Sequence, residues 1–247
     1  MPSDFKIHEV QWTPETIRRF WTCYASTAHG EHAHFSSLFG EQIVSFAQRV
    51  GPLSGLRVLD YGCGPGFMIE RLLHCGARAE GLEFSPESAE KARKRCEGHP
   101  LFRGVALVQK LPSSIQAASV DVVLLIEVLE HLQDDQIGQT LEDIRRMLRV
   151  GGHLVLTTPH NENLERMKTI CPDCGCVFHP WQHVGSFTEM SLSQLLGRHG
   201  MRGVFCEATN FSARCYSKAL QSVRKLFLGP RAQVGQPHLV YIGQRVI

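Results

Sequence analysis

Three glycines at alternate positions, Gly62, Gly64 and Gly66, follow an acidic residue, Asp60, in the stretch VLDYGCGPG. Glycine tolerates positive φ and lets a ligand approach the bare main chain, and the free N–H groups at the start of a following helix attract anionic or polar groups. A second acid, Glu83, follows at the end of the next strand-like run. In nucleotide-binding α/β units, an acid about 20 residues downstream accepts hydrogen bonds from ribose hydroxyls. The pattern therefore indicates a site that holds a nucleotide-like cofactor.

A second group that could do chemistry is the segment Glu127-Val128-Leu129-Glu130-His131. If this segment is helical, Glu127, Glu130 and His131 share one face, because residues three and four apart are neighbours on a helix. An imidazole with an ordinary pKa suits a general base that removes a proton from an alcohol. We interpret His131 and Glu127 as candidate catalytic residues.

The most distinctive segment is CPDCGCVFHPWQH, in which Cys171 and Cys174 have C-x2-C spacing. His179 and His183 continue the pattern as C-x4-H-x3-H. Two thiolates at this spacing bind one tetrahedral zinc ion from a tight turn, and four protein ligands make a zinc site structural. We therefore predict a structural zinc site of Cys171, Cys174, His179 and His183. Cys176 could replace either histidine, and cysteines without metal in a loop are the other interpretation.

The elements that must position these residues alternate between strand and helix. The expected strands are 56–61, 78–83, 104–109, 120–126 and 152–158, and the expected helices are 67–75, 86–96 and 137–149. Such alternation predicts parallel strands with right-handed crossovers, and ligands then bind beyond the carboxyl ends of the strands. Asp60, Glu83 and Glu127 all stand at such ends, so we expect them to converge on one crevice.

The segments on either side of this core are expected to be mainly helical. Thr13 and the following proline indicate a helix start, and a second helix is expected at about 37–50. These leading helices either cover the cofactor or only cap the sheet. Towards the carboxyl end we expect a helix that starts near Thr188 and is completed by residues 192–199, and strands at 203–208 and 238–244.

Residues 213–228 carry an apolar stripe with basic residues between its members, and no acidic residue follows Glu207. This pattern predicts a basic amphipathic helix. Such a helix contacts an anionic membrane or a nucleic acid, or else it packs on its own sheet with a solvated basic face. We favour packing, so peripheral membrane contact is the less favoured interpretation.

Length and composition limit the class of protein. A chain of 247 residues with a net charge of +2 is large enough for one substantial core, and its apolar content is not that of a disordered or fibrous protein. The start, MPSDFKIHEV, has no apolar signal core, and the longest apolar run is too short to span a bilayer. Together with nine scattered or clustered cysteines, this favours a soluble cytoplasmic protein with reduced thiols. We predict a helical cap at 1–55 and a main domain at 56–247 with an insert at about 159–187.

Four stretches together, VLDYGCGPG, GLEFS, SVDVVLLIEVLEHL and LRVGGHLVLTTP, resemble the class I S-adenosylmethionine-dependent methyltransferases over roughly residues 56–201. A dinucleotide enzyme would more typically show G-x-G-x-x-G. The resemblance implies a Rossmann-like α/β fold with a seven-stranded sheet, mostly parallel with the last strand antiparallel, and helices on both faces. It also implies S-adenosylmethionine as cofactor, in addition to the zinc of the insert.

The same resemblance implies a set of cofactor-binding residues. Residues 60–66 would hold the methionine part, Glu83 the ribose, and residues 107–111 the adenine neighbourhood. The expected cofactor-binding residues are Asp60, Tyr61, Gly62, Cys63, Gly64, Gly66, Glu83, Phe84, Lys110, Leu111 and Glu127. Family members often have an acid about four residues before a Leu-Pro pair, and this sequence has none before Leu111-Pro112. Adenine recognition here would then depend on main-chain groups.

Three interpretations of the acceptor follow. The first is methyl transfer to an oxygen or nitrogen of a small-molecule acceptor, in which EVLEHL serves either catalysis or only packing around the cofactor. The second rests on a partial resemblance to small-RNA 3′-terminal 2′-O-methyltransferases, which implies a divalent metal on Glu127, Glu130, His131 and His183. The cysteine-rich insert departs from that pattern, and one imidazole cannot serve two metals. The third is a non-catalytic, zinc-containing module that binds RNA or a protein partner.

Overall fold

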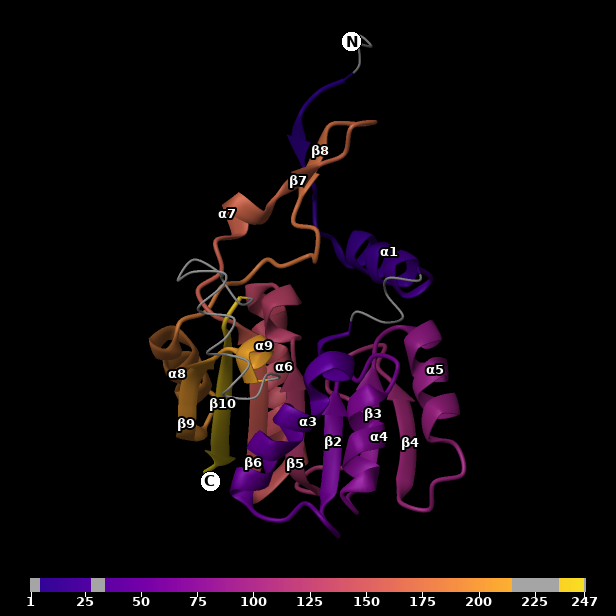
Figure 1. Ribbon diagram of the computed structural model, residues 1–247, viewed down its shortest axis with the longest axis vertical. Coiled ribbons are helices and arrows are strands. Elements are labelled where there is room, and N and C mark those ends of the chain that lie inside the picture. Colours follow the sequence, from indigo (N-terminus) through magenta and orange to yellow (C-terminus); the bar gives the residue numbers. More distant parts are fainter. Residues whose placement is uncertain (1–4, 28–33, 215–235, 247) are drawn as a thin grey trace, which may run out of the picture.

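The computed structural model describes residues 5–27, 34–214 and 236–246, and a seven-stranded sheet forms its centre (Figure 1). The strands are β2 (Arg57–Tyr61), β3 (Arg78–Glu83), β4 (Phe102–Leu107), β5 (Val120–Ile126), β6 (Leu148–Pro159), β9 (Met201–Thr209) and β10 (His238–Arg245). Their order is β4-β3-β2-β5-β6-β10-β9. The neighbours from β4 to β6 pair in parallel, while β10 is antiparallel to both β6 and β9. The predicted fold class is therefore confirmed, with the last strand of the chain inserted between β6 and β9.

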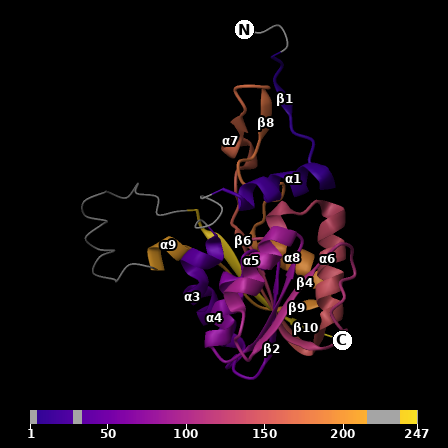
Figure 2. The ribbon, with the colours of Figure 1, turned by 90° about the vertical axis from the view of Figure 1, so that its right-hand side faces the viewer.

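Helices cover both faces of this sheet. One face carries α3 (Phe35–Ala47), its 3-10 extension η1 (Gln48–Val50), α4 (Phe67–His74) and α5 (Pro86–Cys96). The other face carries α6 (Asp134–Met147) and α8 (Glu189–Arg198). Figure 2 shows α3 and α4 on one side of the strands and α6 on the other. Short helical pieces η2 (Leu129–His131), α7 (Leu164–Met167) and α9 (Phe211–Arg214) lie in the connections.

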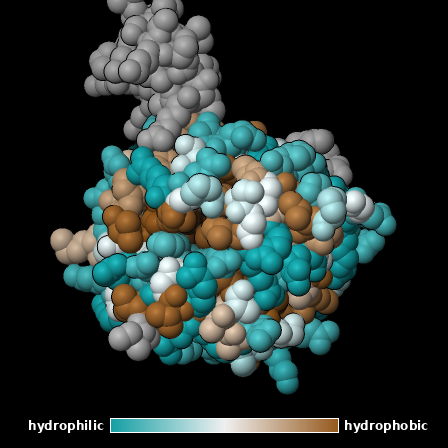
Figure 3. Space-filling view, turned by 90° about the horizontal axis from the view of Figure 1, so that it is seen from below, coloured by the Kyte–Doolittle hydropathy of each residue, from teal (hydrophilic) through white to brown (hydrophobic). Residues whose placement is uncertain are grey.

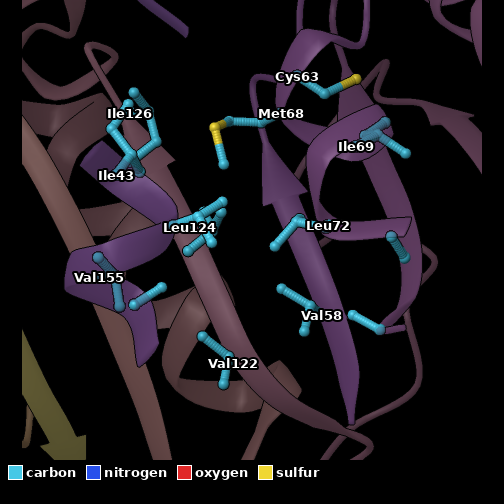
Figure 4. Close-up of a cluster of buried hydrophobic side chains, with 14 of the residues drawn as sticks. Ile43, Val58, Cys63, Met68, Ile69, Leu72, Val122, Leu124, Ile126 and Val155 are labelled. Carbon is cyan, nitrogen blue, oxygen red and sulfur yellow. The ribbon is translucent and has the colours of Figure 1, made fainter. Parts of the chain in front are cut away.

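The hydrophobic core has two halves because successive side chains of a strand point to opposite faces. Val58 and Leu124 belong to the cluster packed against α3 and α4, which also contains Ile43 (Figure 4). Their sequence neighbours Leu59 and Leu125 belong to the cluster packed against α6 and α8. The central strands are thus buried on both faces, which is typical of a doubly covered parallel sheet.

The observed elements follow the predicted ones closely in the core. Strands β3 and β5 and helix α5 have the predicted bounds, whereas β6 begins before the predicted 152–158. Helix α6 begins before the predicted residue 137 because Gln133 and Gln136 form a capping box that caps its first turn. Leu148 pairs with Val120, and an irregularity follows in the register, so the amino-terminal end of β6 joins the sheet before the predicted strand.

A smaller sheet and a helix stand beyond the carboxyl ends of the central strands (Figure 1). The small sheet has the order β1-β8-β7, from β1 (His8–Glu9), β8 (Cys176–Phe178) and β7 (Thr169–Ile170). The helix is α1 (Pro14–Ala25), which begins at the predicted Thr13 cap and carries a capping box with Thr16. Both elements therefore lie at the end of the sheet where the candidate residues stand.

The surface adds two observations. Viewed from below, the end of the molecule opposite the small sheet β1-β8-β7 shows separate hydrophobic patches among hydrophilic residues (Figure 3). Among the helices of the described ranges, none combines the length and apolar character needed to cross a bilayer. The basic amphipathic helix predicted at 213–228 falls, from residue 215 onwards, outside the described residues.

Candidate functional site

Glu83 ties the end of β3 to the glycine turn after β2. Its Oε2 accepts a hydrogen bond of 2.7 Å from the Gly64 N–H, and its Oε1 accepts from the N–H groups of Phe84 and Ser85 at 2.8 and 2.9 Å. Burial raises the pKa of the Glu83 carboxyl, although these three hydrogen bonds oppose the rise. A carboxylate has about four lone-pair sites, and these hydrogen bonds use two on Oε1 and one on Oε2. Glu83 can therefore still accept a hydrogen bond from one ribose hydroxyl at Oε2.

The three glycines of the turn all have positive φ, but they serve different purposes. A Cβ on Gly62 would lie 2.7 Å from Val128 Cγ2, and one on Gly66 would lie 2.9 Å from Ala92 Cα. A Cβ on Gly64 would meet only the ring of His34, at 3.7 Å. The outer two glycines are thus required by close packing, whereas Gly64 leaves its main chain open to a ligand.

Asp60 lies at the carboxyl end of β2 and is only 3% exposed. Burial, and then the nearby charge of Glu83, raise the pKa of its carboxyl to about 8. Ionising such a buried acid is costly unless a cation lies beside it. S-adenosylmethionine carries a sulfonium and an ammonium group, so the charge of this site fits that cofactor.

Two of the predicted cofactor-binding side chains point elsewhere. The Tyr61 side chain is fully buried in the core cluster of the α6 face, because it alternates with Asp60 on β2. Cys63 is buried against Gly81, and burial raises the pKa of its thiol. At these two positions the side chain belongs to the core, so the predicted contact with the cofactor would come from the main chain.

Phe84, Lys110 and Leu111 lie where the adenine was predicted. Phe84 follows Glu83 and is 47% exposed. Lys110 and Leu111 follow the end of β4, which is held beside β3 by a 2.8 Å hydrogen bond from the Val108 N–H to the Glu83 carbonyl. All three residues therefore stand at the same edge of the sheet as the ribose acid.

Glu127 follows β5 with a φ of 52°, which separates it from the residues that come after it. Its Oε2 lies 3.0 Å from His238 Nδ1, while its Oε1 is buried without a hydrogen-bond partner. The helix predicted to align residues 127, 130 and 131 is only the short 3-10 turn η2, and it begins after Glu127. The expectation that Glu127 shares a helical face with residues 130 and 131 is therefore wrong. The main chain at Glu127 is left-handed, and its side chain lies beside His238 of β10.

Glu130 is buried between η2 and β6. Thr158 Oγ1 donates a 2.8 Å hydrogen bond to Glu130 Oε2, but Oε1 has no hydrogen-bond partner. Burial, and then the charge of Glu127, raise the pKa of Glu130 well above its usual range. A buried carboxylate with one oxygen lacking a hydrogen-bond partner is stabilised by a bound cation or by a hydrogen-bond donor. The sequence predicted Glu130 only as part of the metal-binding alternative.

His131 is enclosed by aromatic and histidine rings. Its ring lies 4.9 Å from those of Trp21 and His183, and its Nδ1 lies 3.5 Å from the Gln182 carbonyl oxygen. Because a carbonyl only accepts, we place the proton on Nδ1, which leaves a lone pair on Nε2. Burial, and then the charge of His183, lower the pKa of His131 to about 3. This imidazole is neutral at pH 7 and is a weak base, so its environment suits a metal ligand better than the predicted general base.

Two groups of side chains have the geometry to hold a cation. Ligand atoms of Glu130, His131 and His183 lie within 4.8 Å of one another, and so do those of Glu162, His179 and His183. Glu162 was not predicted from the sequence. The available signal was its position just after the carboxyl end of a strand, which it shares with Glu83 and Glu127.

The four predicted zinc ligands do not come together within the described ranges. The only groups found there with metal-binding geometry contain no cysteine. Cys171 and Cys176 lie at the tip of the β7–β8 hairpin, where the Cys171 N–H donates to the Cys176 carbonyl at 2.8 Å. Strand β8 then rises by about 3.3 Å per residue, which carries His179 away from the tip. The correction is that His179 and His183 join Glu162 instead of Cys171 and Cys174.

Helix α1 closes one side of this histidine group. Trp21 Nε1 donates a 2.9 Å hydrogen bond to Gln182 Oε1, and Gln182 Nε2 donates to the His131 carbonyl at 3.0 Å. Tyr24 and Trp181 make a further edge-to-face contact at 6.0 Å. Of the two roles expected for the leading helices, α1 lines the candidate site, whereas α3 packs into the core. An open hollow lies next to the group, and its lining residues are Asn161, Glu162, Asn163, Leu164, Glu165 and Ser186.

Comparison with known proteins matches most of this fold to one family. Residues 32–204 match the model of a family described as "Methyltransferase domain". A ubiquinone biosynthesis O-methyltransferase of Methylocella silvestris is 41% identical over 83 residues, which cover 34% of this chain and 32% of that protein. The protein of the same name from Ralstonia nicotianae is 32% identical over 122 residues, or 47% of this chain and 49% of that protein. The chain thus spans about half the length of this second relative, and less of the first.

A solved structure gives the same fold over nearly the whole chain. It is the 1,6-didemethyltoxoflavin-N1-methyltransferase of Burkholderia thailandensis, with bound 1,6-didemethyltoxoflavin and S-adenosylhomocysteine. The TM-score is 0.64 at 18% sequence identity, and the match covers 98% of this chain and 94% of that one. At this identity the likeness establishes the fold alone.

Proposed function

The chain belongs to the methyltransferase-domain family, and on that basis we propose that it transfers a methyl group from S-adenosylmethionine to an oxygen of a small-molecule acceptor. The names of the two relatives, both O-methyltransferases, support an oxygen acceptor over a nitrogen. Their name also points to a ubiquinone precursor as one acceptor to test.

The observation that carries the proposal is the joining of Glu83 to the open glycine, Gly64, next to the buried acid Asp60. When bound, S-adenosylmethionine supplies a methyl group on a reactive sulfonium. Glu83 would accept a hydrogen bond from a ribose hydroxyl, and the main chain at Gly64 would contact the methionine part. Asp60 would balance its positive charge. Because the methyl group is already reactive, these residues contribute mainly by positioning it in line with the acceptor.

We propose further that Glu130, His131 and His183 hold a divalent cation on the acceptor side of the site. The fit rests on Glu130 Oε1, which is buried without a hydrogen-bond partner, and on His131 Nε2, which lies 3.9 Å from that oxygen. Bound there, a divalent cation would polarise an acceptor hydroxyl and favour loss of its proton. The neutral His131 supports this role, because a histidine must be neutral to bind a metal.

This cation group includes three of the four residues implied by the resemblance to small-RNA 2′-O-methyltransferases. The fourth, Glu127, lies beside His238 instead. The grouping favours cation-dependent transfer as the form of the reaction, and it carries no information about RNA. A small-molecule acceptor therefore stays the first candidate.

Zinc binding stays a proposal with a revised ligand set. We propose that Cys171, Cys174 and Cys176 of the hairpin tip supply thiolates, which zinc would draw together, because these side chains do not form a metal-binding group in the described structure. Hydrogen bonds from the main chain at Cys174 and Asp173 lower the pKa of the Cys171 thiol, which favours thiolate ligation. Cobalt substitution tests it, since thiolate ligation gives intense visible absorption. A protein purified without chelator and free of zinc would contradict it.

A cytoplasmic location is likewise proposed from thiol chemistry. All eight cysteines among the described residues are free thiols, as expected of a reducing compartment. Localising a tagged full-length chain in cell fractions tests this proposal.

Methyl transfer itself is tested with S-adenosylmethionine that carries a labelled methyl group. Purified protein is incubated with a panel of phenolic, amine and RNA acceptors, with and without added magnesium or manganese. We expect label in an oxygen-methylated small molecule and a lower rate after chelation. Label only in amines or in RNA would contradict the proposed acceptor, and failure to bind the methyl donor would favour a non-catalytic module.

A further inference from the structure

His183 belongs to both groups with cation-binding geometry, so its two ring nitrogens must be assigned. One imidazole nitrogen binds a metal only through an unprotonated lone pair, and the other then carries the proton. The hydrogen-bond partners of His179, Glu162 and His183 decide which nitrogen carries a proton in each ring.

His179 is turned so that it cannot be a ligand in its neutral form. Its Nδ1 accepts hydrogen bonds from the N–H groups of Trp181 and His183, both at 3.3 Å. An accepting Nδ1 has no proton, so the proton lies on Nε2. This Nε2 is buried and makes no hydrogen bond of good geometry, and the nearest carboxylate oxygen, Glu162 Oε1, lies 3.4 Å away. His179 therefore directs an N–H towards Glu162 and offers no lone pair to a cation between them.

Glu162 makes the closer contact with His183. The distance from Glu162 Oε2 to His183 Nδ1 is 2.5 Å, and the carboxylate is 8% exposed. Between a carboxylate oxygen and an imidazole nitrogen at this distance the ring N–H is the donor, so the proton of His183 lies on Nδ1. The lone pair that can bind a cation is then on His183 Nε2.

We propose that Glu162 and His179 are positioning residues that fix the ring and the proton of His183 for cation binding beside Glu130 and His131. Glu162 holds the proton on His183 Nδ1, and the Nε2–H of His179 lies 3.4 Å from the second oxygen of Glu162. This proposal rests on the cation group of Glu130, His131 and His183 put forward above. Outer carboxylates that hold a ligating histidine in this way typically change metal affinity by 10- to 100-fold.

Glu162 and His179 both belong to the insert at about 159–187, and this gives the insert a role in the site. Glu162 follows β6, while His179 and His183 follow β8, and the β7–β8 hairpin lies between them in the chain. Main-chain N–H groups of Val184 and Gly185 donate to the Glu130 carbonyl at 2.8 and 3.0 Å, which holds this end of the insert on η2. The insert would thus shape the acceptor side without touching the glycine turn.

The proton positions can be measured without any substitution. Long-range ¹H–¹⁵N correlation spectra of protein with ¹⁵N-labelled histidine distinguish the two neutral tautomers. In the metal-free protein we expect a proton on Nδ1 of His183 and on Nε2 of His179. A proton on Nε2 of His183 would overturn the proposal.

Cation affinity provides the second test. Calorimetric titration of chelator-treated protein with manganese chloride should give affinities that fall in the order wild type, Glu162→Gln, Glu162→Ala. We expect about a 10- to 100-fold loss for Glu162→Ala and a smaller loss for Glu162→Gln, whose amide oxygen still accepts from Nδ1. His179→Ala should also weaken binding. The exposed Glu165→Gln, from the same segment, should bind as the wild type does.

Two comparisons separate the possible failures. If Glu130→Gln loses manganese binding while Glu162→Ala binds like the wild type, the cation group stands and the positioning role is overturned. If Glu130→Gln also binds like the wild type, the cation group is overturned together with the positioning role. Unchanged affinity of each variant for S-adenosylmethionine shows that the variant is folded.

Discussion

The two sides of the candidate site are built in different ways. The donor side, Asp60, Gly64 and Glu83, comes from two consecutive strand–turn–helix units, and one carboxylate joins its parts. The acceptor side, Glu130, His131, Glu162 and His183, is gathered from the connections after β5, β6 and β8. A site made from neighbouring units keeps a fixed spacing in the sequence, whereas a site gathered by an insert does not.

The two sides share one electrostatic feature. Burial raises the pKa of Asp60 and Glu83 on the donor side and that of Glu130 on the acceptor side. Each set of buried carboxyl groups therefore favours a positively charged ligand. We expect the donor side to bind a sulfonium cofactor and the acceptor side a metal cation, each without the other.

The largest expected effect is on the donor side. Glu83→Ala removes the acceptor for three main-chain N–H groups and for a ribose hydroxyl, so affinity for S-adenosylmethionine should fall about 100-fold, or about 2.7 kcal/mol. Calorimetry measures this change, and the exposed Glu90→Ala on α5 is the matched control. An affinity within twofold of the wild type would show that Glu83 does not hold the donor.

The next effect separates the two sides. Glu130→Gln should lower the rate of methyl transfer about 100-fold, because it removes the charged ligand of the cation group, while affinity for the donor stays unchanged. Steady-state rates and donor calorimetry on the same preparation measure both quantities. Glu142→Gln, on the exposed surface of α6, serves as the control. Loss of donor affinity in Glu130→Gln would contradict the independence of the two sides.

The sequence predicted the donor side well and the acceptor side only in part. Asp60, Gly64 and Glu83 were accessible because turn chemistry and strand ends fix their spacing. The burial of the Tyr61 side chain could not be predicted, because spacing alone does not say to which face of β2 a side chain points. The predicted zinc ligands do not come together, because strand β8 separates His179 from the cysteines of the hairpin tip and the C-x4-H spacing does not reveal a strand at that place. Glu162 needed the tertiary contact with His183, which no local pattern contains.

A pH effect on stability is expected at Asp60. Its pKa is raised to about 8 in the folded chain, so the protonated form favours folding below its unfolded pKa, and this contribution is lost as pH rises from about 4 to about 8. Asp60→Asn lacks this loss. By linkage its stability should exceed that of the wild type by about 5 kcal/mol at pH 8 and by little at pH 4. Urea unfolding at both pH values measures the difference, and an equal difference at both would refute the assignment.

The smallest expected effect concerns the contact of α1 with the acceptor side. Trp21→Phe removes the N–H that donates to Gln182 Oε1, which should lower stability by about 1 kcal/mol and raise the acceptor KM severalfold. Donor affinity should not change. Trp12→Phe, at a ring that contacts Phe20 and lies outside the histidine group, is the control. Equal acceptor KM values for the two variants would contradict the assignment of α1 to the acceptor side.

Calorimetry of the purified wild-type chain with S-adenosylmethionine tests the central claim most directly, because every proposed role depends on a working donor side. We expect one donor molecule to bind per chain, with S-adenosylhomocysteine competing for the same site. Absence of binding by a folded protein, with or without added divalent cation, would contradict the assignment of Asp60, Gly64 and Glu83 to a methyl donor.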